Sequence, residues 1–449
     1  MAHIAVIGAG ITGVTTAYAL LDHGHTVTVF ERHRYPAMET SFANGGQLSA
    51  SNAEVWNQLS TVVKGIKWLF RSDAPLLLNL KPSWHKYSWL AEFIAQIPHY
   101  RRNTISTVRL ALEARRALLS LAKREGIAFD LERRGILHIY RDRRSFEHAA
   151  RVNGLLRQGG LDRHAVDAKD IEAIEPAIHG DYYGGFYTPS DMTGDIHRFT
   201  TELANACVRR GARLICDAIV ERVTTSNWGI RATWRAASAA GVLEESAADA
   251  VVICAGVASR HFATMLGDRV NIYPVKGYSI TVALEDSRSR DAAPWVSLLD
   301  DEPKIVTSRL GPDRFRVAGT AEFNGFNNDI RNDRVRPLVR WTRELFPDVS
   351  TERVVPWAGL RPMLPDMLPR VGAGRRSRVF YNTGHGHLGW TLSAATAEIV
   401  AAAVDASLRP TATMRTGSFV ARIVPPMSQG TLTVRRTSGP GDFQAQRPR

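Results

Sequence analysis

The chain has 449 residues, more than the ~100 to 200 of a typical domain, which predicts more than one domain. Its 44% hydrophobic and 22% charged residues are ordinary for a globular protein and argue against a disordered or fibrous chain. A formal net charge of +13 suggests an anionic partner, but the sequence carries no helix-turn-helix, zinc-finger or single-strand-binding signature. We therefore expect no nucleic-acid partner.

The three cysteines, Cys207, Cys216 and Cys254, show neither a CxxC motif nor a metal-ligand spacing. We expect no metal site, and an odd number of cysteines fits a reducing compartment better than a disulfide framework. The sequence has no run of 18 apolar residues that would predict a membrane span. The N-terminus also lacks the basic region and cleavage site of a signal peptide. A cytoplasmic enzyme is therefore expected.

The N-terminal region predicts a dinucleotide-binding unit. Residues 3–7 form an apolar, strand-like run, a glycine-rich turn follows at once, and residues 14–21 continue with helical apolar spacing. In such a turn the glycines permit a tight bend and a close approach of the backbone to a pyrophosphate, which lies on the helix N-terminus. The expected cofactor contacts are Ile7, Gly8, Ala9, Gly10, Ile11, Thr12 and Gly13.

A second predicted strand, residues 26–30, ends at an acidic residue. Glu31 lies 18 residues beyond Gly13, which is the distance expected of an acid that accepts hydrogen bonds from a ribose. Arg32 follows it and is expected to contact the cofactor as well. A glycine-rich motif alone could be an unrelated turn. Strand, turn, helix and acid together favour dinucleotide binding.

The segment that follows favours FAD over NAD. In an NAD enzyme the sheet would continue through alternating strands and helices, whereas residues 40–47 are small and polar and suit a backbone cradle for another part of the cofactor. A late apolar strand, residues 250–255, ends in small residues that fit an extended FAD. The further expected contacts are Ser41, Asn44, Gly45, Gln47, Val220, Ala255 and Gly256.

A third candidate region lies near residue 385. Residues 378–381 predict a strand, residues 383–389 a glycine-rich loop and residues 391–404 an alanine-rich helix. Backbone N–H groups that converge at the helix start would stabilise negative charge on the N1 and C2=O edge of a reduced flavin. The expected contacts are Gly384, Gly386, His387, Leu388 and Gly389, with His385 as a candidate catalytic residue. For both histidines, a loop position without a function is the alternative.

Six motifs then occur in an order typical of one family. They lie at residues 8–13, 40–47, 184–195, 274–279, 357–366 and 382–391. Over residues 2–407 the chain resembles the D-amino acid dehydrogenase (small-subunit type) branch of the FAD-dependent amine oxidoreductases, relatives of D-amino acid oxidase, glycine oxidase and sarcosine oxidase. One departure is His387, which stands where a small hydroxyl residue is expected. This departure leaves the substrate open.

The resemblance implies an α/β fold with a Rossmann-type FAD-binding domain and a discontinuous second, substrate domain of α+β type with a mainly antiparallel sheet. It implies FAD-dependent oxidative deamination of a D-amino acid to a 2-oxo acid and ammonia, by hydride transfer to flavin N5. The electrons would pass to a respiratory acceptor, a quinone or an electron carrier, rather than to oxygen. The alternative is a related amine oxidoreductase that acts on D-hydroxyproline, glycine, sarcosine or an opine.

Two residues are candidates for the substrate site. Arg361 is followed by a proline-rich stretch that restricts the chain, and a fixed arginine can bind a carboxylate through two parallel hydrogen bonds. The resemblance implies the same role, with a structural ion pair as the alternative. Tyr278 lies on a predicted strand, residues 273–284, that would face the flavin. A half-buried aromatic residue with its hydroxyl in water is the other interpretation.

The predicted domains are discontinuous. Residues 1–52, 175–268 and 355–408 are expected to form the FAD-binding domain, and residues 53–174 and 269–354 the substrate domain. A basic tail, residues 411–449, is rich in Gly, Pro, Ser, Thr and Arg and is predicted to be disordered. Residues 64–102 mix tryptophan with lysine and arginine, a pattern that suits either peripheral contact with the inner membrane or helices that cover the substrate domain.

Overall fold

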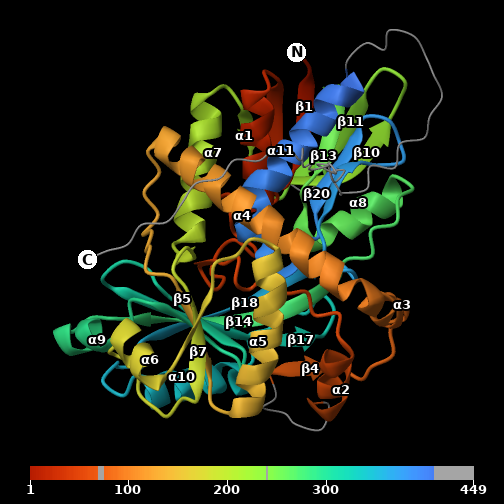
Figure 1. The fold of residues 1–449 in the computed structure, drawn as a ribbon. Coiled ribbons are helices and arrows are strands. Elements are labelled where there is room, and N and C mark those ends of the chain that lie inside the picture. The colour runs from red at the N-terminus through yellow and green to blue at the C-terminus, as the bar shows by residue number, and fades with distance from the viewer. Residues whose placement is uncertain (69–74, 239–240, 409–449) are drawn as a thin grey trace, which may run out of the picture. The chain divides into compact units, whose positions relative to one another are not determined.

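In the computed structural model, the N-terminal strand of the protein lies in the interior of a six-stranded sheet (Figure 1). The model describes residues 1–68, 75–238 and 241–408, without the side chains of residues 64 and 66–68. The strand order is β19 (Arg370–Ala373), β20 (Val379–Thr383), β13 (Ala250–Ile253), β1 (His3–Ile7), β2 (Thr26–Phe30) and β9 (Arg213–Ile215). All neighbours are parallel except β19 and β20, which pair antiparallel. Residues 4–7 of β1 and all of β13 are apolar and buried because both faces of the sheet are covered.

The two faces of this sheet pack against different layers. Ile4 and Val6 of β1 lie in one hydrophobic cluster with four helices, whereas Ala5 and Ile7 lie in another. The helices are α1 (Ile11–Asp22), α4 (Tyr100–Glu125), α7 (Ile196–Arg209) and α11 (Gly389–Leu408). The other face contacts a three-stranded sheet and α8 (Ser259–Met265), and this sheet consists of β10 (Ala218–Thr225), β11 (Ile230–Ala236) and β12 (Glu244–Ala248). Helix, sheet and sheet thus form three layers.

Helix α11 is unusually apolar. Among the described residues, the segment Gly386–Leu408 is the one helical segment that is long and apolar enough to cross a membrane by length and composition. Ala394, Val400 and Val404 of α11 are buried in the same hydrophobic cluster as residues of α1 and α4. Its apolar character is therefore accounted for by packing in the protein core.

A second sheet, with nine strands, lies within the same compact unit. Its order is β18 (Val354–Met363), β14 (Tyr273–Ala283), β17 (Arg314–Phe323), β16 (Ile305–Arg309), β15 (Ser297–Asp300), β5 (Ile136–Tyr140), β7 (Gly184–Thr188) and β6 (His164–Val166), with β4 (Leu76–Leu78) paired to β17. Most pairs are antiparallel. A small two-stranded sheet joins β3 (Gln47–Leu48) to β8 (Met192–Thr193). The predicted fold class is confirmed.

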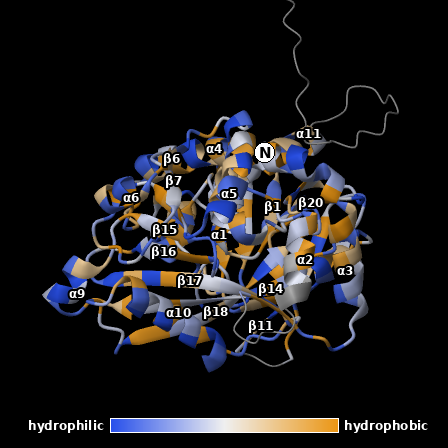
Figure 2. Ribbon diagram, turned by 60° about the horizontal axis from the view of Figure 1, so that its bottom comes forward, coloured by the Kyte–Doolittle hydropathy of each residue, from blue (hydrophilic) through white to orange (hydrophobic). Residues whose placement is uncertain are grey.

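One face of the nine-stranded sheet is covered by α10 (Asn332–Leu345) and α6 (Ala168–Ile174), whose apolar residues share a cluster with β14 and β17. In Figure 2 the helix α9 (Ser287–Ala292) at the surface is mostly hydrophilic. Helix α5 (Arg143–Gln158) packs against α4. The opposite face of the nine-stranded sheet borders the site described below.

Residues 1–409 form a single compact unit and are not divided further. The division of this unit into two domains therefore stays a prediction. Two strands nevertheless depart from the predicted segments. β7 lies within residues 175–268 and β18 within 355–408 apart from its first residue, yet both pair in the nine-stranded sheet rather than in the six-stranded one. The predicted tail, residues 411–449, lies outside the described residues.

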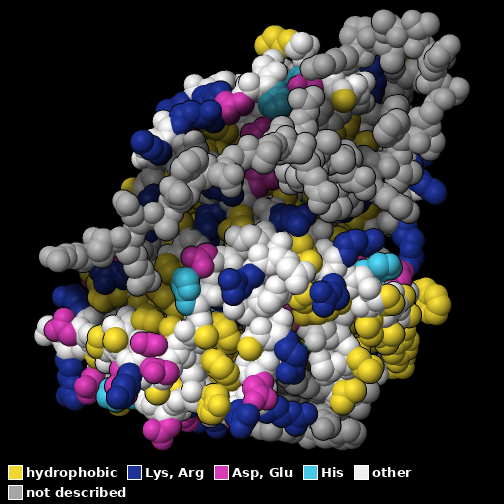
Figure 3. Space-filling model, in the orientation of Figure 1, with side chains coloured by type: hydrophobic (Ala, Val, Ile, Leu, Met, Phe, Trp, Pro, Cys, Tyr) yellow, Lys and Arg dark blue, Asp and Glu magenta, His cyan; other side chains and the backbone are white. Residues whose placement is uncertain are grey.

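Residues 64–102 form α2 (Leu59–Trp68), β4, α3 (Trp84–Ala95) and the short helix η1 (Ile97–His99), and residues 69–74 lie outside the described part. Trp89 is buried, but Trp84 and Leu80 are 84% and 69% exposed. Figure 3 shows hydrophobic side chains gathered over α2 and α3. A membrane contact at this surface stays a prediction.

Candidate active site

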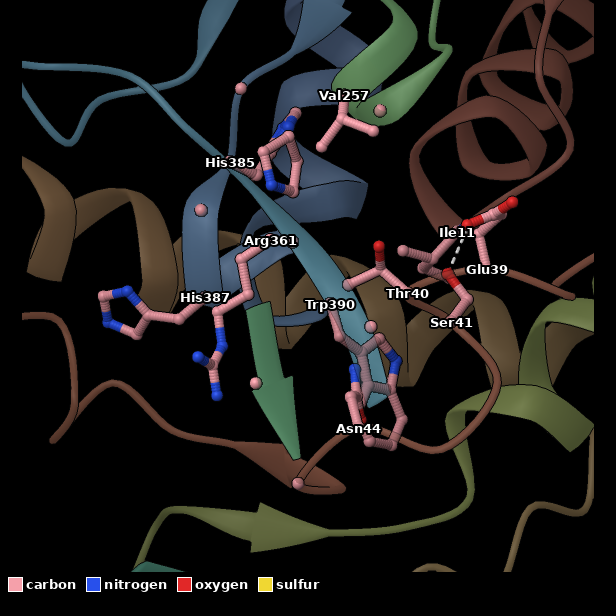
Figure 4. Close-up of a pocket in the computed structure, with 18 of the residues that line it drawn as sticks. Ile11, Glu39, Thr40, Ser41, Asn44, Val257, Arg361, His385, His387 and Trp390 are labelled. Atoms are coloured by element: carbon pink, nitrogen blue, oxygen red, sulfur yellow. Dashed lines mark hydrogen bonds between the residues drawn. The ribbon is translucent and has the colours of Figure 1, made fainter. Parts of the chain in front are cut away.

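A large cavity lies where the carboxyl ends of the parallel strands face the nine-stranded sheet. Its volume is about 1150 Å³, and it is lined by the ends of β1, β2, β13 and β20, by residues 38–61, and by residues of β14, β17 and β18. Ligands of open α/β sheets bind outside the carboxyl ends of the strands. The cavity is therefore the candidate cofactor and substrate site, and Figure 4 shows a part of it.

The structure brings nearly all of the predicted cofactor contacts to this cavity. The residues that line it are Ile7, Gly8, Gly10, Ile11, Thr12, Glu31, Arg32, Ser41, Asn44, Gly45, Gln47, Val220, Ala255, Gly256, Gly384, Gly386, His387 and Gly389. Ala9, Gly13 and Leu388 do not line it. Leu388 is instead buried in a hydrophobic cluster with residues of α4 and α5. Periodicity in the sequence could not distinguish a loop residue that faces the cofactor from one that faces the core.

The turn after β1 is held by the acid at the end of β2. Glu31 accepts hydrogen bonds from the backbone N–H groups of Ala9, at 2.8 Å, and His33, at 3.0 Å, and it is buried. A Cβ atom on Gly13 would lie 1.8 Å from the backbone oxygen of Gly8, so this close approach requires glycine. Glu31 thus positions the turn that would hold a pyrophosphate, in addition to facing the cavity itself.

Polar side chains of residues 40–47 brace the cradle rather than point freely into it. Ser41 accepts a hydrogen bond from the backbone N–H of Ile11 at 3.0 Å, drawn as a dashed line in Figure 4. The Asn44 side chain accepts from the N–H of Gly46 at 3.0 Å. Gln47 donates to Ser297 Oγ of β15 at 2.8 Å. These bonds fix the segment between the two sheets.

The two candidate histidines are both uncharged at neutral pH. Burial lowers the pKa of His385 to about 3, and its ring is hydrogen-bonded to Thr396 of α11 at 3.0 Å. Burial lowers the pKa of His387 to about 4 against the opposing effect of its bond to the Asn52 oxygen, and the Arg361 charge lowers it further. Because Nε2 donates to that oxygen, Nδ1 of His387 is an acceptor, and it has no partner.

Arg361 lies on the cavity face of the nine-stranded sheet. Its guanidinium donates from Nη1 to the backbone oxygen of Thr320 at 3.0 Å, and Arg361 forms no ion pair among the described residues. Desolvation lowers its pKa to about 10, so it stays charged at neutral pH. The side chain is of intermediate exposure, and its accessible part borders the cavity (Figure 4). The predicted alternative, a structural ion pair, finds no acidic partner within the described chain.

The guanidinium passes directly over a glycine of the neighbouring strand. A Cβ atom on Gly277 would lie 2.3 to 2.6 Å from the guanidinium atoms of Arg361. Strand β17 contains a bulge at this point, since two of its residues, Thr320 and Ala321, lie opposite the single residue Gly277 of β14 between the pairs Lys276–Glu322 and Tyr278–Gly319. Thr320, in this bulge, has a φ of 59°, which is strained for a β-branched residue. Its hydroxyl is buried and has no hydrogen-bond partner within the described part of the chain.

Tyr278 does not fit the role predicted for it. Its hydroxyl donates to Glu322 at 2.7 Å, and its ring packs in the cluster that contains Leu338 and Trp341 of α10. Its strand partner Gly319 faces the same way, because a Cβ there would contact Leu338. Tyr278 touches the cavity, but its side chain points to the opposite face of the sheet. We assign it no catalytic role.

Several residues of the site escaped the sequence analysis. Trp56 stacks on His387 with ring centroids 4.9 Å apart, and Trp390 lines the cavity (Figure 4). Thr320 was missed as well, because its bulge depends on strand pairing. The tryptophan in the motif at 382–391 was a usable signal. No motif in the sequence pointed to Trp56 or Thr320.

The residues present fit an FAD. The N-terminus of helix α1, with its glycine N-cap Gly10, lies at the cavity wall, and the N-terminus of a helix favours an anion. Trp390 offers a buried indole N–H without a partner on the cavity wall. Residues Gly384 and Gly386, with φ of 77° and 60°, bend the loop before α11 around the same space. A cavity of about 1150 Å³ that is lined by the glycine-rich turn, residues 40–47 and the loop before α11 suits a dinucleotide that carries a flavin.

Fold and cavity together define a flavin-type oxidoreductase built on a dinucleotide-binding sheet. The family described as FAD dependent oxidoreductase matches residues 3–403, and the chain belongs to this family. Similar solved structures include glycine oxidase from Geobacillus kaustophilus, with 21% identity, a TM-score of 0.71 and coverage of 92% of this chain and 96% of that one. At this identity the likeness shows the fold alone.

Two curated relatives are similar in sequence over nearly their whole length. D-amino acid dehydrogenase 3 of Mesorhizobium japonicum is 62% identical over 409 residues, covering 91% of this chain and 98% of that protein. D-amino acid dehydrogenase of Paramagnetospirillum magneticum is 41% identical, covering 93% and 98%. The family resemblance inferred from the six motifs is confirmed.

Proposed function

We propose that the protein is a D-amino acid dehydrogenase that deaminates its substrate oxidatively to a 2-oxo acid and ammonia. The observation that carries the proposal is Arg361, a charged guanidinium on the cavity wall with a single backbone hydrogen bond and no ion pair among the described residues. A desolvated guanidinium without a carboxylate is unfavourable unless a ligand supplies one. The names of the relatives at 62% and 41% identity support an amino acid of D configuration.

Arg361 would bind the substrate carboxylate through its remaining donors. The fork of a guanidinium matches a carboxylate in two parallel hydrogen bonds, so it fixes the orientation as well as the position of the substrate. Gly277 leaves room for the guanidinium, and Thr320 anchors it. The unpartnered hydroxyl of Thr320 is the natural third donor to that carboxylate.

The cofactor, when bound, supplies the oxidising chemistry by accepting a hydride from the substrate Cα at flavin N5. The protein's part is positioning, since the amine has to be neutral and the Cα–H bond has to be aligned. Neutral His387 is stacked on Trp56, and it lies close enough to Arg361 for the guanidinium charge to lower the pKa of its ring. Its Nδ1 is an acceptor for an amine N–H. The imine that leaves would hydrolyse to the 2-oxo acid.

The electron acceptor and location form a further part of the proposal. A dehydrogenase needs an acceptor other than oxygen, for which we propose a respiratory quinone or electron carrier. The exposed apolar residues of α3 and its surroundings, Leu80, Trp84 and Tyr87, support a peripheral contact with the inner membrane from the cytoplasmic side. Free cysteines at positions 207, 216 and 254 are compatible with a reducing compartment.

A substrate panel tests the proposal. D- and L-amino acids, glycine, sarcosine, D-hydroxyproline and an opine would be offered to the purified flavoprotein with an artificial electron acceptor, with and without oxygen. We expect D-amino acids to reduce the acceptor equally well in both atmospheres. Turnover of sarcosine or glycine in preference to every D-amino acid would contradict the assignment, and strong oxygen dependence would contradict the dehydrogenase assignment.

A further inference from the structure

A second group of charged residues lines the same cavity, away from Arg361. We call it the Arg163 chamber, and its residues are Glu54, His138, Tyr140, Arg163, Asp301 and Lys304. These groups act electrostatically on one another, whereas none of them perturbs Arg361. Residues 52–56 connect the Arg361 end of the cavity with the Arg163 chamber. The Asn52 oxygen binds His387, Trp56 stacks on His387, and Glu54 lies between them in the chain and belongs to the chamber.

Arg163 is buried in this chamber without a direct ion-pair partner among the described residues. It is 5% exposed, and it forms no ion pair with any described residue. Its guanidinium lies 4.7 Å from the centre of the Phe186 ring, and its Nη2 reaches the Tyr140 hydroxyl only at 3.4 Å. Its Nε has no hydrogen-bond partner. Burying a guanidinium whose N–H donors lack acceptors destabilises the folded protein, unless a bound ligand supplies those acceptors.

The other charged side chains of the chamber have partners of their own. Lys304 is paired with Asp301. Glu54 accepts hydrogen bonds from Tyr100 and Gln58, and desolvation raises the pKa of its carboxyl. Burial and the nearby cations hold the pKa of His138 well below its usual value, so this ring is neutral. Arg163 therefore forms no direct ion pair with either carboxylate of the chamber.

We propose that Arg163 binds a second carboxylate, at the end of the substrate's side chain, so that the preferred substrates are dicarboxylic D-amino acids. The inference rests on the proposed function, with Arg361 holding the α-carboxylate and residues 52–56 lining the path between the two ends. Tyr140 adds a donor, since burial raises the pKa of its hydroxyl to about 12 and keeps it protonated. A side-chain amide would place an NH₂ group against the guanidinium, and an aliphatic end would leave it unpaired.

The test compares each acid with its own amide. D-Aspartate and D-glutamate would be assayed against D-asparagine and D-glutamine, which match them in size, and D-2-aminoadipate would test a longer chain. In the wild type we expect kcat/KM to favour at least one acid over its amide by tenfold or more. In Arg163→Met that ratio should fall to one or below, mainly through KM of the acid. A wild type that prefers the amides would overturn the proposal.

Arg141→Met is the control, because it removes the same charge from the end of β5, a strand of the same sheet. Arg141 pairs with Asp300 and does not line the cavity. We expect its acid-to-amide ratio to match the wild type. An equal loss for acids and amides in Arg163→Met alone would assign Arg163 to stability and overturn the proposal. If Arg163→Met does not fold, the conservative Arg163→Lys and the wild-type ratio decide the question.

A binding experiment separates this inference from the proposed function. Glutarate and butyrate would be titrated into the oxidised holoenzyme, with the flavin absorbance near 450 nm as the readout. We expect glutarate, or succinate if the chamber is short, to bind at least tenfold more tightly than the monocarboxylate, and Arg163→Met to remove the difference. This result stands even if no D-amino acid is turned over. Equal binding of both acids by the wild type would refute the chamber as a carboxylate site.

Discussion

Arg361 and Thr320 are joined by a 3.0 Å hydrogen bond, in which the guanidinium Nη1 donates to a backbone oxygen that a strained bulge turns toward it. The bond leaves the charge of Arg361 uncompensated, because a backbone oxygen carries no formal charge. It uses one of the five N–H donors of the side chain. The arrangement holds an arginine in place while leaving most of its capacity for a carboxylate.

Arg361→Lys keeps the positive charge but loses the planar fork. We expect kcat/KM for a D-amino acid to fall by about tenfold or more, and Arg361→Ala to be worse, while FAD binding is unchanged. Steady-state kinetics and the flavin spectrum measure the two effects. An amine without a carboxylate is the comparison substrate, and the alanine variant should lose most of the preference for the amino acid. If both variants discriminate as well as the wild type, Arg361 is structural.

Gly277→Ala should displace the guanidinium without touching its charge. The new Cβ would lie within 2.6 Å of three guanidinium atoms, closer than real contacts allow, so the side chain has to move. We expect a loss of kcat/KM similar to that of Arg361→Lys, with FAD retained. Gly154→Ala in α5 is the control, because nothing lies within 4 Å of its Cβ position. Wild-type kinetics in Gly277→Ala would show that the position of the guanidinium does not matter.

Thr320→Val removes the unpartnered hydroxyl and keeps the branched shape. If that hydroxyl donates to the substrate carboxylate, KM should rise by about five- to tenfold, which corresponds to roughly 1 to 1.5 kcal/mol for one hydrogen bond. Thr320→Ser retains the donor and should stay within about twofold of the wild type. Equal effects of the two substitutions would point to packing of the methyl group instead.

Glu31→Gln tests the cofactor end of the cavity. The carboxylate accepts from the N–H groups of both Ala9 and His33, whereas an amide can accept with one end only and places an NH₂ group against the other donor. We expect FAD to bind more weakly by roughly 1.5 to 3 kcal/mol, about 10- to 150-fold in Kd. Titration of the apoprotein with FAD measures it. An unchanged Kd would mean that neither the turn nor the ribose depends on this acid.

The cofactor site was largely predictable from the sequence because its signals are local. Strand, turn, helix and acid follow one another within the first 31 residues, and the structure places Glu31 on the cavity wall. Its bond from the Ala9 N–H was not predicted. Arg361 was recognisable for a similar reason, since its neighbours restrict the backbone. Both are properties of short segments, which a single sequence displays.

The substrate side was less predictable because it depends on strand pairing. Alternation along residues 273–284 predicted a strand, but not which face turns to the flavin, and Tyr278 lies on the other one. The strain at Thr320 arises only when β17 pairs with β14. Arg163 gave no signal, since it stands out only by having no direct ion-pair partner among the described residues once the chain is folded. Partner strands follow from the fold, which also explains why β7 and β18, although they lie in segments predicted for the FAD-binding domain, pair in the nine-stranded sheet.

The low pKa of His387 predicts a specific loss of stability in acid. In the folded protein this pKa is about 4, below the ~6.5 of an exposed histidine. Between pH 6.5 and 4 the unfolded chain therefore binds a proton that the folded chain does not. Stability from this group is complete above pH 6.5 and falls as the pH drops through that window. His385, with a pKa of about 3, acts in the same direction.

His387→Gln should make the protein less sensitive to acid, because glutamine can still donate to the Asn52 oxygen but does not titrate. We expect the difference in unfolding free energy between pH 7.5 and pH 5 to shrink by on the order of 1 kcal/mol. Urea unfolding at the two pH values, followed by flavin release, measures it. His164→Gln, at an exposed position on β6, should leave the difference as in the wild type. An identical pH dependence in His387→Gln would show that His387 carries a proton in the folded state, and its role as a neutral acceptor beside Arg361 would have to be abandoned.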